Sequence, residues 1–278
     1  MAIVANTFLT FSAIGNREDL KDDIYNISPT DTPFQANIGK NKATAVLHEW
    51  QTDALAAAAA NAQLEGDDHT SFAAVVPTTR IVNRCQISSK DVIVSGTQDA
   101  VNKAGRNREM VYQMLLRSNE LKRDMEFVLT NNQAPVVGNS TTARALRPLC
   151  SWYATNDSRG AGGADGTTTT AATDGTQRAF TESLLKTVLQ NCWTSGGEPD
   201  LVMVGAFNKT VASGFTGNAT RIDKSEDKRL VAAVDVYESD FGVVKIVANR
   251  FSRSRDAHVL DTSLWAVSSL RPMGTVDL

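Results

Sequence analysis

The chain has 278 residues, with 28 basic and 31 acidic side chains and a net charge of −3. This balance argues against a nucleic-acid-binding protein built on one broad basic surface. Hydrophobic residues make up 42% of the chain and aromatic residues only 6%, so we expect a folded protein with a mostly aliphatic core rather than a disordered one.

Three cysteines, Cys85, Cys150 and Cys192, lie far apart and form no CxxC or Cys/His cluster. The sequence therefore predicts neither a metal site nor a disulfide framework, but buried free thiols in a reducing compartment. There is no apolar run of membrane-spanning length and no signal-peptide pattern near the N-terminus, so we expect a protein that stays in a cytoplasm-like environment.

The first part of the chain predicts an arm followed by two strands and a long loop. Residues 1–40 mix short apolar pairs with Asn, Thr, Gly and Pro, which indicates an extended arm that must lie on something else. Strands are predicted over 43–50 and 79–94. The connection between them includes an alanine-rich tract over 53–65. It is far longer than a hairpin loop, so we expect it to be functional or disordered.

Charge is distributed unevenly between this loop and the next segment. Residues 43–79 contain five acids and no Lys or Arg, whereas residues 103–123 contain six bases and two acids. The second segment also predicts the clearest amphipathic helix, over 105–131, which would be about 40 Å long. Its apolar stripe consists of Met110, Met114, Leu121, Met125 and Leu129.

The remainder predicts alternating helices and strands around a low-complexity insert. Of the 18 residues in 160–177, 15 are Gly, Ala or Thr, which predicts a mobile surface loop without a core. Periodicity then predicts helices over 179–192 and 207–215. Strands are predicted over 200–206, 230–237, 242–248, 258–260 and 264–270.

The sequence contains only weak candidates for catalytic, phosphate-binding or metal-binding motifs. The chain contains no P-loop, no G-x-G-x-x-G after a strand and no G-x-S-x-G, which are the commonest phosphate-binding and nucleophile motifs. Asp223, Glu226 and Asp227 mimic the carboxylate spacing of metal-dependent nucleases, but they lie among alternating charges typical of a solvated face. We therefore expect no catalytic residues, no metal and no cofactor.

Three local stretches can be compared with a known family: DDIYNISPTDTPF (22–34), HEWQTDAL (48–55) and VYESDFGVVKIVANRF (236–251). Together with the order arm, strand–loop–strand, long helix, mixed domain and terminal strands, they resemble the major capsid proteins of tailed double-stranded DNA bacteriophages. These proteins share the Hong Kong ninety-seven type capsid fold. The resemblance covers most of the chain and rests on order and local sequence.

The resemblance implies an α+β fold with four parts. These are an N-terminal arm (1–40), a peripheral domain (41–132) with an extended β-loop (50–79) and a long helix (105–131), a mixed α/β axial domain (133–257) and C-terminal strands (258–278). Two departures are expected. The strand that follows the L-R-P segment (270–272) in most relatives is expected to be either shortened here or replaced by another segment, and we expect no N-terminal extension that serves as a built-in scaffold.

The resemblance implies a structural subunit that self-assembles into hexamers and pentamers of an icosahedral head enclosing double-stranded DNA. The implied location is the virion capsid, which would be assembled in the cytoplasm of the bacterial host. No contact with a membrane is implied. Implied partners are other copies of the chain, a separate scaffolding protein, a portal protein, optionally a decoration protein, and packaged DNA bound without sequence specificity. The alternatives are a tail-tube or minor head protein and, less favoured, an uncharacterised hydrolase.

From the charge pattern we predict an assembly interface in which the acidic loop lies near the basic half of the long helix of a neighbouring subunit. Apolar loop residues would supply the burial, and the tryptophan at the loop base would pack at a hinge. The predicted interface residues are Glu49, Trp50, Asp53, Leu55, Leu64, Glu65, Asp67, Asp68, Phe72, Arg106, Arg108, Arg117, Lys122 and Arg123.

Overall fold

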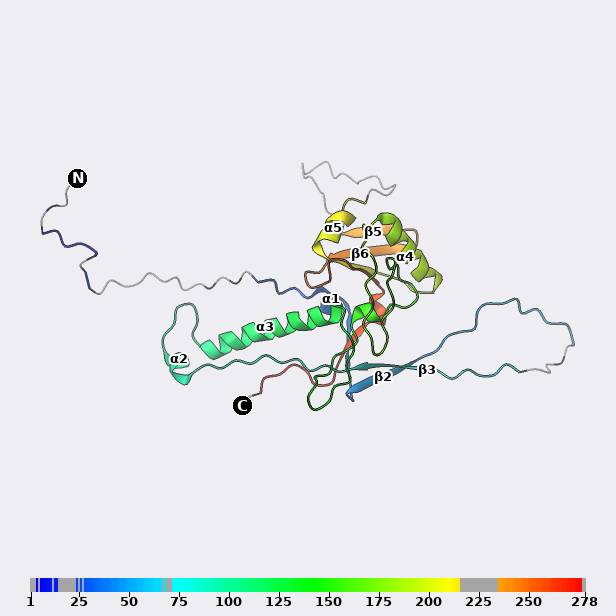
Figure 1. Cartoon of the computed structure of the whole chain (residues 1–278), viewed down its shortest axis with the longest axis horizontal. Helices are drawn as coiled ribbons and strands as arrows, with labels where there is room; N and C mark the ends of the chain where they lie inside the picture. Colours follow the sequence, from blue (N-terminus) through cyan, green and yellow to red (C-terminus); the bar gives the residue numbers. More distant parts are fainter. Residues whose placement is uncertain are drawn as a thin grey trace. The chain divides into compact units, whose positions relative to one another are not determined.

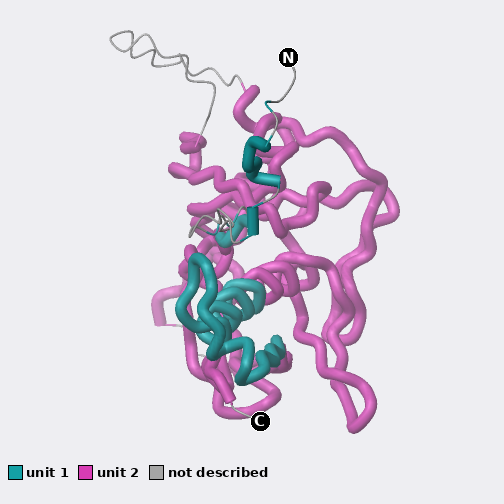
Figure 2. Tube along the Cα trace, turned by 90° about the vertical axis from the view of Figure 1, so that its left-hand side faces the viewer, with its two compact units in different colours: residues 1–30, 89–121 teal, residues 31–88, 122–278 magenta. Residues whose placement is uncertain are grey.

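The computed structural model describes residues 4, 6–11, 13–14, 24, 26, 28–66, 68, 72–215 and 235–276. Two compact units divide the chain, as Figure 2 shows: residues 1–30 with 89–121, and residues 31–88 with 122–278. The described residues combine helices and mainly antiparallel strands, consistent with the expected α+β class. The carboxylates Asp223, Glu226 and Asp227 and the start of the strand predicted over 230–237 lie outside the described residues.

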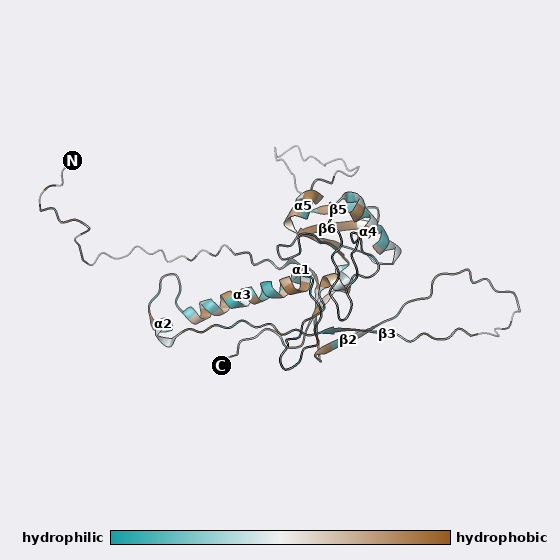
Figure 3. Cartoon of the chain, in the orientation of Figure 1, coloured by the Kyte–Doolittle hydropathy of each residue, from teal (hydrophilic) through white to brown (hydrophobic). Residues whose placement is uncertain are grey.

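The long helix α3 spans Glu109–Thr130, within the range predicted for it. It passes from the first unit to the second after Leu121, and Figure 3 shows alternating hydrophilic and hydrophobic bands along it. The helix begins later than predicted because the Asp99 carboxylate accepts hydrogen bonds from the backbone N–H groups of Glu109 (2.8 Å) and Met110 (3.2 Å). Asp99 itself lies on the short helix α2 (Gly96–Ala100).

A four-stranded sheet forms the core of the second unit. Its strand order is β5 (Val236–Ser239), β6 (Gly242–Ala248), β4 (Leu201–Val204) and β7 (Ala257–Leu260). β4 runs parallel to β6, and the other two pairs are antiparallel. All four residues of β4 are buried, because a central strand covered on both faces reads as a continuous apolar run. The sheet therefore reaches Leu260, beyond the boundary expected at residue 257.

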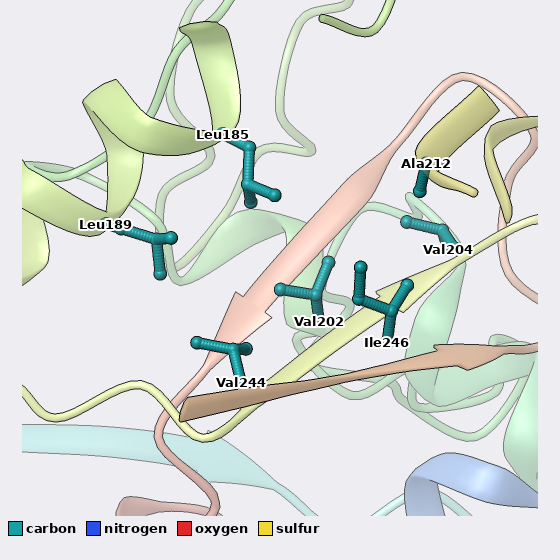
Figure 4. Close-up of a cluster of buried hydrophobic side chains, with 7 residues drawn as sticks. All are labelled: Leu185, Leu189, Val202, Val204, Ala212, Val244 and Ile246. Atoms are coloured by element: carbon teal, nitrogen blue, oxygen red, sulfur yellow. The ribbon is translucent and has the colours of Figure 1, made fainter. Parts of the chain in front are cut away.

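Side chains alternate between the two faces of β4. Val202 and Val204 join a cluster with two helices that follow the predictions, α4 (Glu182–Thr194) and α5 (Ala206–Ala212). The strand β6 supplies the remaining buried members of this cluster, whose side chains are drawn in Figure 4. Figure 1 shows β5 and β6 of the sheet close to α4 and α5.

Leu201 and Met203 face the other way, into a second cluster that contains Phe34 and Ile38. Phe34 lies in the short helix α1 (Pro33–Asn37). The arm expected over 1–40 therefore includes core residues near its C-terminal end, since Phe34 and Ile38 are buried against the sheet. Three short elements complete this side of the unit: β1 (Gly39–Lys42), the 3-10 helix η3 (Thr262–Leu264) and β8 (Ala266–Ser269), which pairs in parallel with β1.

Two further strands, β2 (Leu47–Thr52) and β3 (Thr79–Arg84), form an antiparallel ladder at the base of the long loop. β2 begins and ends later than the strand predicted over 43–50, and β3 is shorter than the strand predicted over 79–94. The prediction of a strand through residue 94 was wrong: Ile87 and Ile93 lie outside any strand and are exposed. Their apolar side chains gave a strand pattern in the sequence, but no neighbouring strand covers them among the described residues.

The Gly/Ala/Thr-rich segment 160–177 is held in place, unlike the free surface loop predicted from its composition. Ala164 and Thr173 form a β-bridge, and Ala172 is buried, with its carbonyl and N–H both bonded to the Asn132 side chain. A Cβ on Gly160 would lie 1.9 Å from the Thr176 carbonyl oxygen. The small residues therefore permit close backbone packing. The preceding 3-10 helix η1 spans Leu149–Ser151.

Candidate functional site

The loop from residue 53 to 78 presents large apolar side chains to solvent. Leu55, Leu64 and Phe72 are 99%, 80% and 87% exposed. Except for a turn at residues 65–66, its described residues form no helix or strand, so the alanine tract is not helical in this structure. Figure 1 shows the loop running far beyond the end of the β2–β3 ladder. Exposed apolar side chains grouped in this way mark an interaction surface.

Aromatic rings are stacked at the base of the loop. Trp50 on β2 lies between His48, with ring centroids 5.8 Å apart, and Trp152, with centroids 5.5 Å apart. The guanidinium of Arg147 covers the Trp152 ring at 4.0 Å, and the His48 Nε2 lies 3.1 Å from the Ser268 Oγ on β8. Trp50 thus anchors β2 to the body of its unit, while its own assembly role stays a prediction.

The predicted acidic residues have local contacts or face solvent. Glu49 forms an ion pair with Arg80 across the β2–β3 ladder (3.6 Å), and the Asp53 carboxylate accepts the N–H of the next residue, Ala54 (2.9 Å). Glu65 and Asp68 are exposed. Asp67 lies outside the described residues.

Two of the predicted basic residues form ion pairs with acidic residues of α3. Arg106 forms an ion pair with Glu109 and also lies over the Tyr112 ring, 5.2 Å from its centroid. Arg117 forms an ion pair with Glu120, one turn later (2.7 Å). Arg117 therefore stabilises α3 through a pair within the helix, and Arg106 pairs with the first residue of α3, so less of their charge is open to a neighbour than the sequence implied.

The other three predicted bases differ in exposure. Arg123 is partly buried, with its guanidinium over the Phe251 ring at 5.6 Å from the centroid. Arg108 and Lys122 are exposed. Of the five predicted bases, Arg108 and Lys122 are the ones best placed to meet an acidic partner, and that contact stays a prediction.

Sequence reasoning missed a buried carboxylate on the same helix, that of Glu126, which is 0% exposed. Its oxygens accept the backbone N–H groups of Phe34 (2.7 Å) and Gln35 (3.1 Å) at the start of α1, and the side-chain amide of Asn249 (2.7 Å) after β6. No sequence motif near Glu126 indicates this contact. In the structure Thr32, the N-cap of α1, supplies no capping hydrogen bond, so the N–H groups at the start of α1 need an acceptor from elsewhere.

A cavity of about 260 Å³ lies beside the sheet and is lined by Cys150, Asp256 and His258, among others. One ligand atom from each of these residues lies within 4.8 Å of the others, a spatial grouping that the spacing of the cysteines in sequence does not indicate. The residues come together because η1 packs against the start of β7, a contact that spacing in sequence does not reveal. Of the three free thiols, Cys150 is buried and Cys85 and Cys192 are only partly buried.

The electrostatics of this cluster follow from its burial. Burial, assisted by the charge of Asp256, raises the pKa of Cys150 to about 12. Burial also lowers the pKa of His258 to about 4. At neutral pH the thiol is protonated and the imidazole neutral. A protonated, buried thiol is a poor nucleophile, so the arrangement does not favour covalent catalysis.

Comparison with known proteins agrees with a structural role. A family model described as SU10 major capsid protein matches residues 3–278. The major capsid protein of Escherichia phage Phieco32 is 26% identical over 303 aligned residues, which cover 95% of this chain and 86% of the relative. Among the described residues, no helix has both the length and the apolar character needed to span a membrane. Because the family model extends over nearly the whole chain, the chain belongs to the SU10 major capsid protein family, whose members are structural proteins of the phage capsid.

Proposed function

We propose that this capsid protein is a shell subunit of the Hong Kong ninety-seven type, whose loop 53–78 lies on a neighbouring subunit. The exposure of Leu55, Leu64 and Phe72 carries the proposal. Each such side chain contributes about 1.5–3 kcal/mol when it becomes fully buried. A loop that leaves all three in water gains this stabilisation only when another surface covers them.

The N-terminal arm supports the same mode of assembly. Phe8, Phe11 and Ile14 are exposed, while Phe34 and Ile38 at the end of the expected arm are buried in the core of their unit. The arm would therefore be attached at its C-terminal end and would bury its earlier apolar side chains on other subunits.

Charge would set the orientation of the loop on its neighbour. Glu65 and Asp68 are exposed on the loop, and Arg108 and Lys122 are exposed basic side chains. Exposed ion pairs contribute at most about 1 kcal/mol each, so these residues would select the register of docking while the apolar side chains supply most of the affinity.

In the proposed shell, subunits form hexamers and pentamers, with residues 41–132 as the peripheral domain and residues from 133 to the end of β7 as the axial domain. The head would enclose double-stranded DNA without sequence-specific contacts, and the net charge of −3 is compatible with this because cations can balance the charge of the packaged DNA. Assembly would take place in the bacterial cytoplasm with a separate scaffolding protein and a portal protein, and a decoration protein is an optional further partner.

A triple substitution tests the loop contact. In the test variant Leu55, Leu64 and Phe72 are each changed to Ser. The matched control changes Ala56, Ala58 and Ala60 to Ser, which alters the same loop at as many positions but removes little apolar surface. Full-length proteins are compared by sedimentation velocity and negative-stain microscopy. Thermal unfolding of the unassembled subunits checks their folding.

The test variant should unfold at the same temperature as the wild type, since the three side chains are already exposed, and should lose more than tenfold in assembled fraction. The alanine control should assemble normally into rings or shells. Normal assembly of the test variant would contradict the proposed loop contact. A wild-type chain that forms tubes, or stays dispersed when co-expressed with its phage's other head proteins, would contradict the shell subunit itself.

A further inference from the structure

We propose that Cys150, Asp256 and His258 bind one divalent transition-metal ion, with zinc as the best fit. A thiolate, a carboxylate and an imidazole are the three ligand types that zinc takes from proteins. Their ligand atoms lie within 4.8 Å of one another. This site is separate from the loop and arm surfaces and does not depend on how the subunits assemble.

The distance between the first two ligands already suits the ion. The Cys150 Sγ lies 3.5 Å from the Asp256 Oδ2. With Zn–S of about 2.3 Å and Zn–O of about 2.1 Å, a tetrahedral ion separates these atoms by about 3.6 Å. One ring nitrogen of His258 lies within 4.8 Å of the sulfur and of a carboxylate oxygen, so the imidazole would complete a three-residue set by moving toward them.

His258 has a ring nitrogen available for this purpose. The side chain is 2% exposed, and its Nδ1 lies 3.1 Å from the Tyr153 hydroxyl. Its Nε2 is buried without a hydrogen-bond partner in the part of the chain that the structure describes. An unsatisfied buried polar atom costs free energy. Coordination through Nε2 would satisfy it and leave Tyr153 to orient the ring, the usual arrangement around a ligating histidine.

The surrounding charges also allow a cation. Arg253 forms ion pairs with both Asp256 (3.2 Å) and Asp174, so its charge keeps a partner when Asp256 turns to a metal. On binding, the Cys150 thiol would release its proton to solvent. The divalent ion, the thiolate and the carboxylate would then together carry no net charge, which avoids the cost of an unpaired buried charge. The adjoining cavity of about 260 Å³ has room for a water molecule as the fourth ligand.

The experiment uses the full-length subunit, freed of metal and then titrated with zinc. Native mass spectrometry should show one zinc ion per chain. The melting temperature should rise by about 5 °C at a free zinc concentration about 100 times the dissociation constant. Cobalt in place of zinc should give a thiolate-to-metal charge-transfer band. Cys150→Ser and His258→Gln should abolish that band and the thermal shift, whereas the control Cys192→Ser, which removes a thiol outside the cluster, should retain both.

A second measurement on the wild-type chain removes dependence on the folding of the variants. Zinc should slow alkylation of Cys150 at least tenfold, with Cys85 and Cys192 unchanged, as read by peptide mass mapping. The proposal is overturned if the wild type binds no zinc, if the cobalt band persists in Cys150→Ser, or if zinc leaves the alkylation rate of Cys150 unchanged.

Discussion

The backbone N–H of Phe34 donates a 2.7 Å hydrogen bond to the buried carboxylate of Glu126. The same carboxylate accepts the Asn249 amide at 2.7 Å. One side chain on α3 therefore joins the helix that follows the N-terminal arm to the loop that follows β6. This contact fixes the backbone at Phe34, near the C-terminal end of the expected arm, against α3.

Glu126→Gln should destabilise the subunit by about 2–4 kcal/mol. A glutamine keeps the size of the side chain but replaces one acceptor oxygen by an NH₂ group, which would face N–H donors such as that of Phe34. Urea unfolding of unassembled subunits measures the effect. The matched control is Glu120→Gln on the same helix, which removes only the partly exposed ion pair with Arg117 and should cost no more than about 1 kcal/mol. Equal losses in the two variants would contradict the role assigned to Glu126.

Hydrophobic periodicity predicted the elements whose buried residues all lie within one short stretch of sequence. The run D-L-V-M-V-G-A predicted β4 because a central strand is covered on both faces, and the apolar stripe of α3 predicted a long helix. The strand predicted through residue 94 failed for a related reason. Ile87 and Ile93 have the composition of a strand but no strand partner among the described residues, and pairing is what the sequence pattern does not reveal.

Contacts between distant segments were not predictable. Glu126 reads as one more charged residue at the edge of a helix, and nothing near it in the sequence indicates four donor groups from elsewhere in the chain. Cys150 and His258 meet only because η1 and β7 pack together. The glycines of 160–177 were taken for flexibility, although their role is to let two backbone segments approach closely. Composition does not distinguish these two uses of glycine.

The start of α3 should loosen in acid. Hydrogen bonds from the N–H groups of Met110 and Glu109 lower the pKa of Asp99 below its ordinary value of 3.8. A carboxyl group whose pKa is lowered by folding stabilises the folded state above its ordinary pKa, and this stabilisation disappears as the pH falls through the lower folded-state value. Hydrogen-exchange protection at the start of α3 should therefore be higher in the wild type than in Asp99→Asn near neutral pH.

That difference in protection should narrow as the pH falls below 3.8, because the asparagine does not titrate. Asp91→Asn, at an exposed acid of the same unit, serves as the control and should leave protection at the start of α3 unchanged at every pH. A difference between wild type and Asp99→Asn that stayed constant through the acid range would show that the charge of Asp99 does not hold the helix start.

Trp50→Ala should loosen the base of the long loop. Trp50 contacts both His48 and Trp152, and aromatic pairs contribute about 0.5–1.5 kcal/mol each beyond the area they bury. We expect a loss of about 1–2 kcal/mol in unfolding free energy and faster hydrogen exchange in β2, with Trp50→Phe largely restoring both. Trp193→Ala removes a tryptophan that stacks on Phe241 instead and should leave exchange in β2 unchanged. Faster exchange there in both variants would mean that the stack has no specific role.

Gly160→Ala should be costly although alanine is the smallest possible addition. The new Cβ would lie 1.9 Å from the Thr176 carbonyl oxygen, so the backbone of the insert must shift, at a cost of about 1–3 kcal/mol. The control Gly274→Ala places a Cβ with nothing within 4 Å and should change the unfolding free energy by no more than about 0.5 kcal/mol. Urea unfolding compares the two variants, and exchange of the Ala172 amide, which bonds to Asn132, reports whether the insert itself has loosened. If Gly160→Ala were as stable as the control and Ala172 equally protected, the insert would be the free loop that its composition predicted, and its glycines would not serve close packing.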